Sequence, residues 1–100
     1  MATNQMAVIP PQTAAKVSPI QDARGCDAIT VSADNLAGAE IVQLLVIAGS
    51  TPKQVTDIYG TVINLTAVIS SVALEGGAQY QFSKPVTAGP CGVYVSVKNG

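Results

Sequence analysis

The chain of 100 residues contains no histidine, no tryptophan, only two cysteines and few charges. The absence of histidine removes the commonest general acid–base group and every nucleophile that depends on a Ser–His or Cys–His pair. Two cysteines without histidine are too few for a tetrahedral zinc site. The longest apolar run, Ile41–Ile47, contains Gln43 and is far shorter than the roughly 20 residues of a membrane helix. We therefore expect no enzyme, no cofactor, no metal and no membrane span.

Charged residues make up 11% of the chain, and the formal net charge is −1. Ordinary soluble domains carry about 25% charged residues, so part of this surface is expected to be covered by other protein. Self-association as a homo-oligomer would provide such a cover, because a core this small leaves a thin stability margin. The basic residues form no cluster that could bind phosphates, which argues against a nucleic-acid partner. They are scattered at Lys16, Arg24, Lys53, Lys84 and Lys98.

Residues 1–25 differ from the rest of the chain. They contain three prolines. They lack both the basic start and the apolar stretch of a secretory signal, so we expect the protein to stay in the cytoplasm, where it is made. Pro10 and Pro11 enforce extended backbone. The segment is interpreted as an extended N-terminal arm, residues 1–25, before a β-sandwich domain, residues 26–100. The arm residues expected to contact a partner are Met6, Val8, Ile9, Pro10, Pro11, Val17 and Ile20.

From Cys26 onward, short apolar stretches alternate with turn residues at regular spacing, which predicts an all-β fold: a small antiparallel β-sandwich or barrel. Glu40 to Ile47 is apolar on both faces and is expected at the centre of a sheet or in an interface. Ala48 to Pro52 is interpreted as a break. The other expected strands are Ala28–Ser32, Val55–Tyr59, Ala78–Ser83 and Gly92–Val97.

The stretch Thr61 to Leu74 fits both a helical stripe and an alternating strand. Its β-branched and polar residues favour two strands with a bend near Thr66 and Ala67. Cys26 and Cys91 could form a disulfide if the first and last strands were neighbours. In a reducing cytoplasm, two buried free thiols are the simpler expectation.

Two groups of side chains are candidates for chemistry or binding. The carboxylate pairs Asp22 with Asp27 and Asp34 with Glu40 would need to face one cleft to act as acid and base, and the alternative for both is a solvated surface. The aromatic residues could instead form a platform for stacking sugars. They are Tyr59, Tyr80, Phe82 and Tyr94.

The run from Leu74 to Val95 combines a Gly-Gly turn, a Tyr-x-Phe strand, Lys-Pro and a Gly-Val step into the last strand. It resembles the closing hairpin of small virion proteins of tailed bacteriophages. The resemblance implies a head decoration, or cement, protein: a compact β-sandwich on the outside of the capsid that binds the major capsid protein. Such a protein would be located on the virion, made in the cytoplasm of a host bacterium, and assembled as a dimer or trimer. No residue-level binding motif can be carried over from it.

Two other functions stay open at this point. One is a carbohydrate- or receptor-binding module of a phage tail or fibre, which the tyrosines suggest. The other is a subunit of a head–tail connector. Each would, like a decoration protein, be a structural or binding protein without catalysis.

Overall fold

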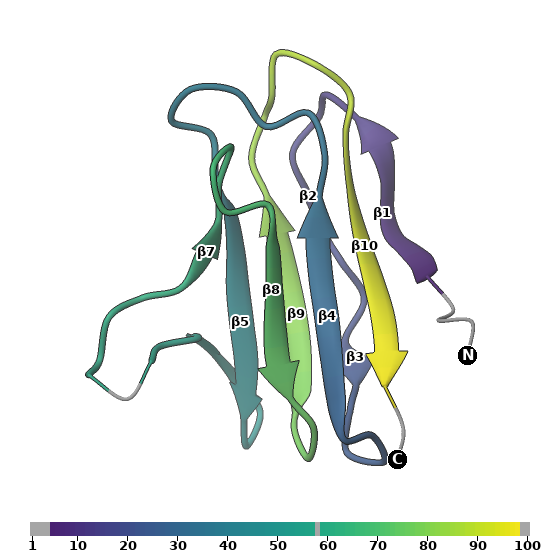
Figure 1. The fold of residues 1–100 in the computed structure, drawn as a ribbon, viewed down its shortest axis with the longest axis vertical. Coiled ribbons are helices and arrows are strands. Elements are labelled where there is room, and N and C mark those ends of the chain that lie inside the picture. Colours follow the sequence, from purple (N-terminus) through teal and green to yellow (C-terminus); the bar gives the residue numbers. More distant parts are fainter. Residues whose placement is uncertain (1–4, 58, 99–100) are drawn as a thin grey trace.

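The computed structural model describes residues 5–57 and 59–98, and these contain ten β-strands and no helix (Figure 1). No helix in this part of the chain could therefore cross a membrane. The strands are β1 (Gln5–Gln12), β2 (Lys16–Val17), β3 (Gln21–Asp22), β4 (Ala28–Ala33), β5 (Val42–Ala48), β6 (Thr51–Gln54), β7 (Asn64–Leu65), β8 (Ser71–Glu75), β9 (Gln79–Lys84) and β10 (Cys91–Lys98).

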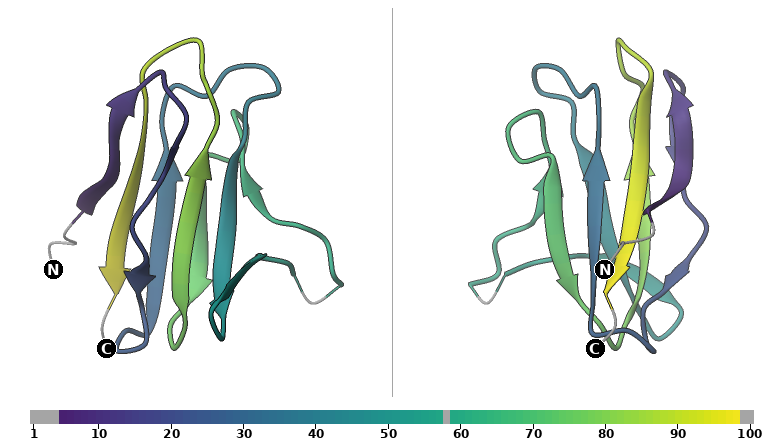
Figure 2. Two further views of the ribbon diagram at one scale, coloured as in Figure 1. Left: turned by 180° about the vertical axis from the view of Figure 1, so that it is seen from behind. Right: turned by 45° about the vertical axis from the view of Figure 1, so that its right-hand side comes forward.

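The strands form two antiparallel sheets packed face to face, which confirms the predicted β-sandwich (Figure 2). Sheet A has the order β1-β10-β4-β8. Sheet B has the order β2-β9-β5-β6, with β3 also paired to β9 and β7 also paired to β5. The first half of the chain thus runs antiparallel to the second half, like one long hairpin wound into two layers. This strand order is that of a jelly roll.

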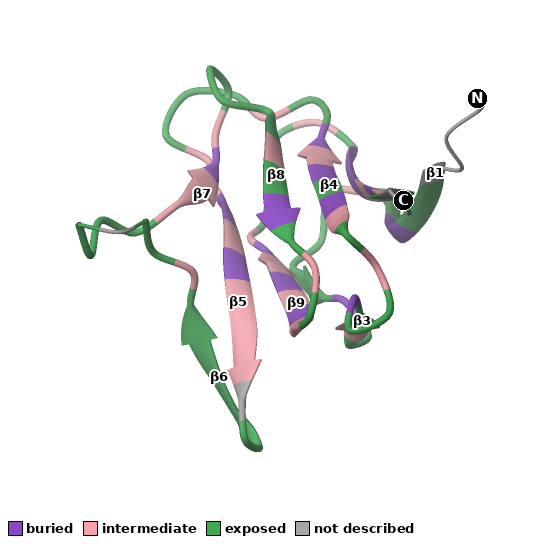
Figure 3. Cartoon of the chain, turned by 60° about the horizontal axis from the view of Figure 1, so that its bottom comes forward, coloured by how far each residue is buried: buried purple, intermediate pink, exposed green. Residues whose placement is uncertain are grey.

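Alternation of side chains explains why these segments form strands at the interface of two layers. In β9, Tyr80, Phe82 and Lys84 point into the molecule, whereas the intervening glutamines and serine are half-buried (Figure 3). The central strand β5 buries Val42 and Leu44 completely and half-buries its other face, as its two-sided apolar sequence predicts. The remaining core side chains come from both sheets: Val8, Ile9, Ala23, Ile29, Val31, Ala33, Leu65, Leu74, Cys91, Val93 and Val95.

The predicted boundary at residue 25 is wrong, because the N-terminal segment belongs to the sandwich. β1 pairs with β10 in sheet A, and β2 and β3 pair with β9 in sheet B. The ladder between β1 and β10 shifts register twice, between Ala7 and Ile9 and again between Ile9 and Gln12. A bulge of this kind places an extra residue on one strand. It allows the consecutive Val8 and Ile9 both to be buried. Residues 1–4 of the predicted arm lie outside the described residues.

The second half of the chain follows the sequence prediction with two differences. Thr61 to Leu74 is β as predicted, with β7 and β8 separated by a turn at Thr66. Thr51 and Pro52, interpreted as part of a break, instead begin the edge strand β6, where Pro52 is tolerated because its missing N–H would face away from the sheet. The strand predicted over Val55–Tyr59 is reduced to a single bridge between Thr56 and Val62, and Ile58 lies outside the described residues.

The two cysteines are free thiols and lie at opposite ends of the sandwich. The ladder between β4 and β10 places Ala28 opposite Lys98 and Ala33 opposite Val93. Cys26 precedes one end of this ladder and Cys91 lies beyond the other, so the pair is too far apart for a disulfide. Burial of Cys91 raises the pKa of its thiol. The disulfide considered for Cys26 and Cys91 is therefore absent.

Candidate binding surface

The exposed apolar side chains are unevenly distributed. We define the loop end as the end of the sandwich where β4 finishes and β5 starts, formed by residues 13–15, 34–41, 66–70 and 85–90 (Figure 1). Val68, Ile69 and Val86 are 92%, 56% and 71% exposed there. Scattered exposed apolar residues are normal, whereas several on the loops of one end indicate an interaction surface.

The opposite end of the sandwich carries four exposed charged side chains. Asp22 and Arg24 form an ion pair with an N–O distance of 2.8 Å, and the guanidinium lowers the pKa of Asp22 to about 2. Asp27 and Glu75 are also exposed at this end, where Ala28 pairs with Glu75. The two ends therefore differ in degree: the loop end has the most exposed aliphatic side chains, whereas the opposite end has four exposed charged side chains beside the exposed Ile20 and Val97.

At the loop end, polar side chains are engaged within the molecule. Asp34 accepts a hydrogen bond from the backbone N–H of Gly92 at 2.7 Å. The side-chain amide of Asn35 donates to the carbonyl of Pro90, also at 2.7 Å. Asn35 has a φ of 57°, a left-handed conformation that asparagine tolerates better than most residues. These bonds fix the 34–41 loop against the 85–90 loop.

Glu40 joins the same two loops from the other side. Its Oε1 accepts from the backbone N–H of Ala37 at 2.9 Å, and its Oε2 accepts from Ala88 at 2.8 Å. The two backbone donors, Ala37 first, lower the pKa of the Glu40 carboxyl. Asp34 and Glu40 were a candidate acid–base pair. Each instead accepts backbone N–H bonds, which is the pattern of a structural carboxylate.

Lys84 is a buried cation beneath the loop end, with only 2% of its surface exposed. Its Nζ donates to the carbonyl of Ala14 at 2.7 Å and to that of Pro85 at 2.9 Å. A buried ammonium needs such partners, because desolvation without hydrogen bonds is very costly. Lys84 thereby holds the 13–15 loop, which is also tied by a bond from Thr87 N–H to the Thr13 carbonyl at 3.0 Å.

The turn that presents Val68 and Ile69 is also fixed by a side chain. The hydroxyl of Thr66 accepts from the N–H of Val68 at 3.2 Å and from that of Ile69 at 2.8 Å. A backbone bond from Thr66 N–H to the Ile69 carbonyl at 2.8 Å closes the turn. The loops are therefore preorganised, and a partner that binds them would lose less free energy to ordering.

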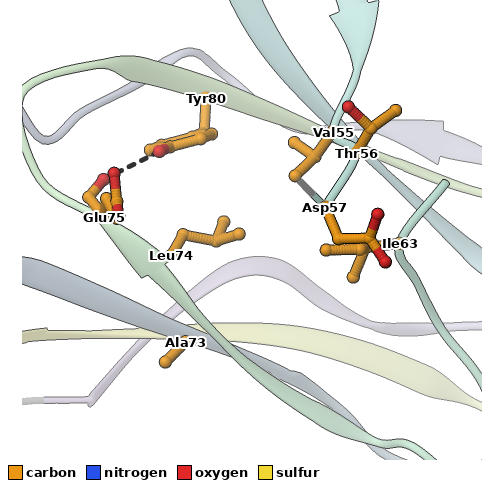
Figure 4. Close-up of a pocket in the computed structure, with 8 residues that line it drawn as sticks. All are labelled: Val55, Thr56, Asp57, Ile63, Ala73, Leu74, Glu75 and Tyr80. Atoms are coloured by element: carbon orange, nitrogen blue, oxygen red, sulfur yellow. Dashed lines mark hydrogen bonds between the residues drawn. The ribbon is translucent and has the colours of Figure 1, made fainter. Parts of the chain in front are cut away.

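A groove of about 430 Å³ opens on the side of the sandwich, between β8 and residues 55–57 and 63 (Figure 4). Tyr80 lies at its inner end and donates its hydroxyl to the carbonyl of Glu75 at 2.7 Å. Burial raises the pKa of Tyr80. The groove is lined by Val55, Thr56, Asp57, Ile63, Ala73, Leu74, Glu75 and Tyr80. It is mostly apolar, with two carboxylates at its rim.

No protein-family model, curated protein or solved structure matches the chain. Within the described residues, no group of three or more His, Cys, Asp or Glu side chains could hold a metal ion. The surfaces of the molecule are therefore the features that bear on its function.

The structure separates the residues predicted to contact a partner. Val8 and Ile9 are core residues of sheet A, so their prediction as contact residues is wrong. The other five remain on the surface: Met6, Pro10, Pro11, Val17 and Ile20. Sequence reasoning missed Val68, Ile69 and Val86, because exposure of an apolar residue in a loop leaves no periodic signal. The one available signal was their position beside turn residues.

The aromatic side chains do not form a platform. Phe82 is fully buried and Tyr80 is 6% exposed, whereas Tyr59 is 85% exposed and projects from the sandwich between β6 and β7. Tyr94 packs over Gly92, where an added Cβ would lie 2.6 Å from the tyrosine hydroxyl. The same hydroxyl is 3.4 Å from Asp34 Oδ2. These positions remove the stacking surface that motivated a sugar-binding function.

Proposed function

We propose that this chain is a non-enzymatic structural protein of a virus particle, which decorates the capsid and stabilises it by binding the major capsid protein. The observation that carries the proposal is the polarity of the sandwich. One end presents apolar side chains on preorganised loops, and the other end presents exposed charge. A protein that decorates a capsid needs one apolar surface that binds the shell and one polar surface that faces the solvent.

Three further features support the proposal. Lys84 is buried, and the carboxylates of Asp34 and Glu40 accept hydrogen bonds from backbone N–H groups, so these three charged groups of the loop end already have partners within the molecule. The jelly roll is a common fold of capsid proteins, although lectins share it and a fold alone does not establish a function. The third is the resemblance of Leu74 to Val95 to decoration proteins; this run passes from β8 through β9 into β10, and β9 and β10 lie in different sheets and do not form the hairpin that the resemblance implies.

The test is co-sedimentation with empty shells assembled from the major capsid protein encoded in the same gene cluster. Wild-type protein should pellet with the shells. The double variant Val68→Asp and Val86→Asp should remain in the supernatant, because each carboxylate would have to be desolvated at the contact. Both sites are more than two-thirds exposed, so these variants should fold normally.

Met6→Asp is the matched control, because Met6 is 55% exposed but lies on edge strand β1. It should pellet like the wild type. A wild-type protein that does not pellet, or a gene cluster without a major capsid protein, would overturn the proposed function. Loss of binding in Met6→Asp alone would assign the contact to β1 and overturn the loop end as the binding surface.

A further inference from the structure

The four edges of the two sheets differ in how well they are protected against pairing with another strand. Edge strand β1 contains Pro10 and Pro11 and two register shifts. The edge formed by β2 and β3 is interrupted by Pro19, and β6 contains Pro52 and Lys53. Prolines, lysines and bulges are the devices by which natural sheets block edge-to-edge association.

Edge strand β8 has none of these devices. Its sequence, Ser71 to Glu75, contains no proline, glycine or lysine, and its register with β4 continues without a shift. It also forms one wall of the apolar groove. An unprotected edge beside an apolar groove indicates that another strand covers both.

The hydrogen bonds that flank β8 identify its free backbone groups. Ala33 N–H donates to the Ser70 carbonyl at 2.9 Å, and Gly76 N–H donates to the Asp27 carbonyl at 3.0 Å. In an antiparallel ladder, every second pair of residues is hydrogen-bonded. Residues 72 and 74 therefore bond to β4, and Ser71, Ala73 and Glu75 direct their N–H and C=O groups away from it.

We propose that β8 pairs with β8 of a second copy, antiparallel and about a two-fold axis at Ala73. This is the centre that pairs all three outward-directed residues at once: Ala73 with Ala73, and Ser71 with Glu75. The carbonyl of Glu75 already accepts from Tyr80, but a carbonyl oxygen can accept a second bond. On the core-facing side, Val72 would lie opposite Leu74 of the second copy.

Charge and symmetry favour a second copy as the occupant. The only charged side chain of β8, Glu75, would lie opposite the neutral Ser71, so the two carboxylates would be at opposite ends of the joint. Like charges directly opposite each other would destabilise the pair. The prolines on the other edges disfavour pairing of β8 with a different edge, so the contact closes as a dimer and does not extend into a fibre.

The dimer would also cover the groove. A strand added to β8 in the plane of sheet A would lie over the groove mouth, because β8 is one of its walls. Residues 59–63, which project from the sandwich, would then extend beneath the second copy, and they include Tyr59 and Val62, which are 85% and 40% exposed. These side chains would enlarge an interface that five paired residues alone would leave small.

The first test is analytical ultracentrifugation of the wild type and of Ala73→Pro over a range of concentrations. The N–H of Ala73 points away from β4, so proline at this position blocks the free edge without removing a bond of the β4 ladder. We expect a wild-type dimer and an Ala73→Pro monomer with an unchanged far-UV circular dichroism spectrum. A wild-type monomer at all concentrations, or a folded Ala73→Pro dimer, would overturn the proposal.

The second test locates the axis by cross-linking in a Cys26→Ser background, since Cys91 is buried. Two Ala73→Cys chains should form a disulfide on oxidation, because paired residues lie about 5.5 Å apart between Cα atoms. Thr30→Cys is the matched control. Thr30 is exposed, and it lies on β4 opposite Ala73 of the same copy, so it is one strand further from the axis. Equal cross-linking at both positions, or none at position 73, would overturn the proposed axis.

This inference does not depend on the capsid hypothesis, and the two can fail separately. A dimer that does not bind shells would leave the β8 contact intact and remove the proposed function. A monomer whose shell binding is lost in Ala73→Pro would show that a capsid segment covers β8, which overturns the second copy as its occupant.

Discussion

Replacement of Ile9 tests whether the N-terminal segment is part of the core. Ile9 is fully buried in β1, and Ile→Ala in such a site removes its transfer free energy and leaves a cavity. The cost is about 2–5 kcal/mol, against a total unfolding free energy of roughly 5–15 kcal/mol for a small domain. Met6→Ala is the control, because Met6 lies in the same strand but is 55% exposed. It should cost about 0.5 kcal/mol or less.

The assay is urea unfolding followed by circular dichroism and tyrosine fluorescence, since the chain has no tryptophan. With a denaturant slope of about 1–3 kcal/mol per molar urea, Ile9→Ala should lower the midpoint by roughly 1–3 M. One protein concentration must be used throughout, because self-association would shift the midpoint. Equal small effects of Ile9→Ala and Met6→Ala would refute the packing of β1, as would a fully stable chain without residues 1–25.

Two further predictions concern Glu40 and the cysteines. The lowered pKa of Glu40 means that its carboxylate contributes stability above its ordinary pKa of 4.5 and loses it as the pH falls through the lowered value. The melting temperature of the wild type should therefore exceed that of Glu40→Gln at pH 6, and the gap should close in acid; a gap independent of pH would contradict this. In thiol labelling of the native protein, Cys26 should react and the fully buried Cys91 should react only in denaturant. Two fast thiols, or none, would be inconsistent with the structure.

Much of the fold could be predicted because apolar and polar side chains alternate along several of the strands. β9 and β10 alternate clearly, and the structure has strands where the sequence predicts them. The bend at Thr66 was also predictable, since a hydroxyl that bonds nearby backbone N–H groups competes with regular structure. The two-sided apolar sequence of β5 correctly placed this strand at the centre of a sheet.

The N-terminal segment was misjudged because proline is ambiguous. Pro10 and Pro11 exclude a helix, but extended backbone suits a detached arm and an edge strand equally well. The bulges that bury Val8 and Ile9 depend on pairing with β10, more than 80 positions away, and no local pattern reports such a contact. The loop end has the same difficulty, because the loops that meet there are brought together only by the winding of the chain.

The pairing of β1 with β10 has a consequence for how the protein is made. β10 lies between β1 and β4 in sheet A, so an inner strand of that sheet is synthesised after both of its neighbours. Until then, the backbone groups of β1 and β4 that pair with β10 have no partner. This layer therefore cannot form before β10 has been made, and a change that removed β10 would take away an inner strand of the sheet.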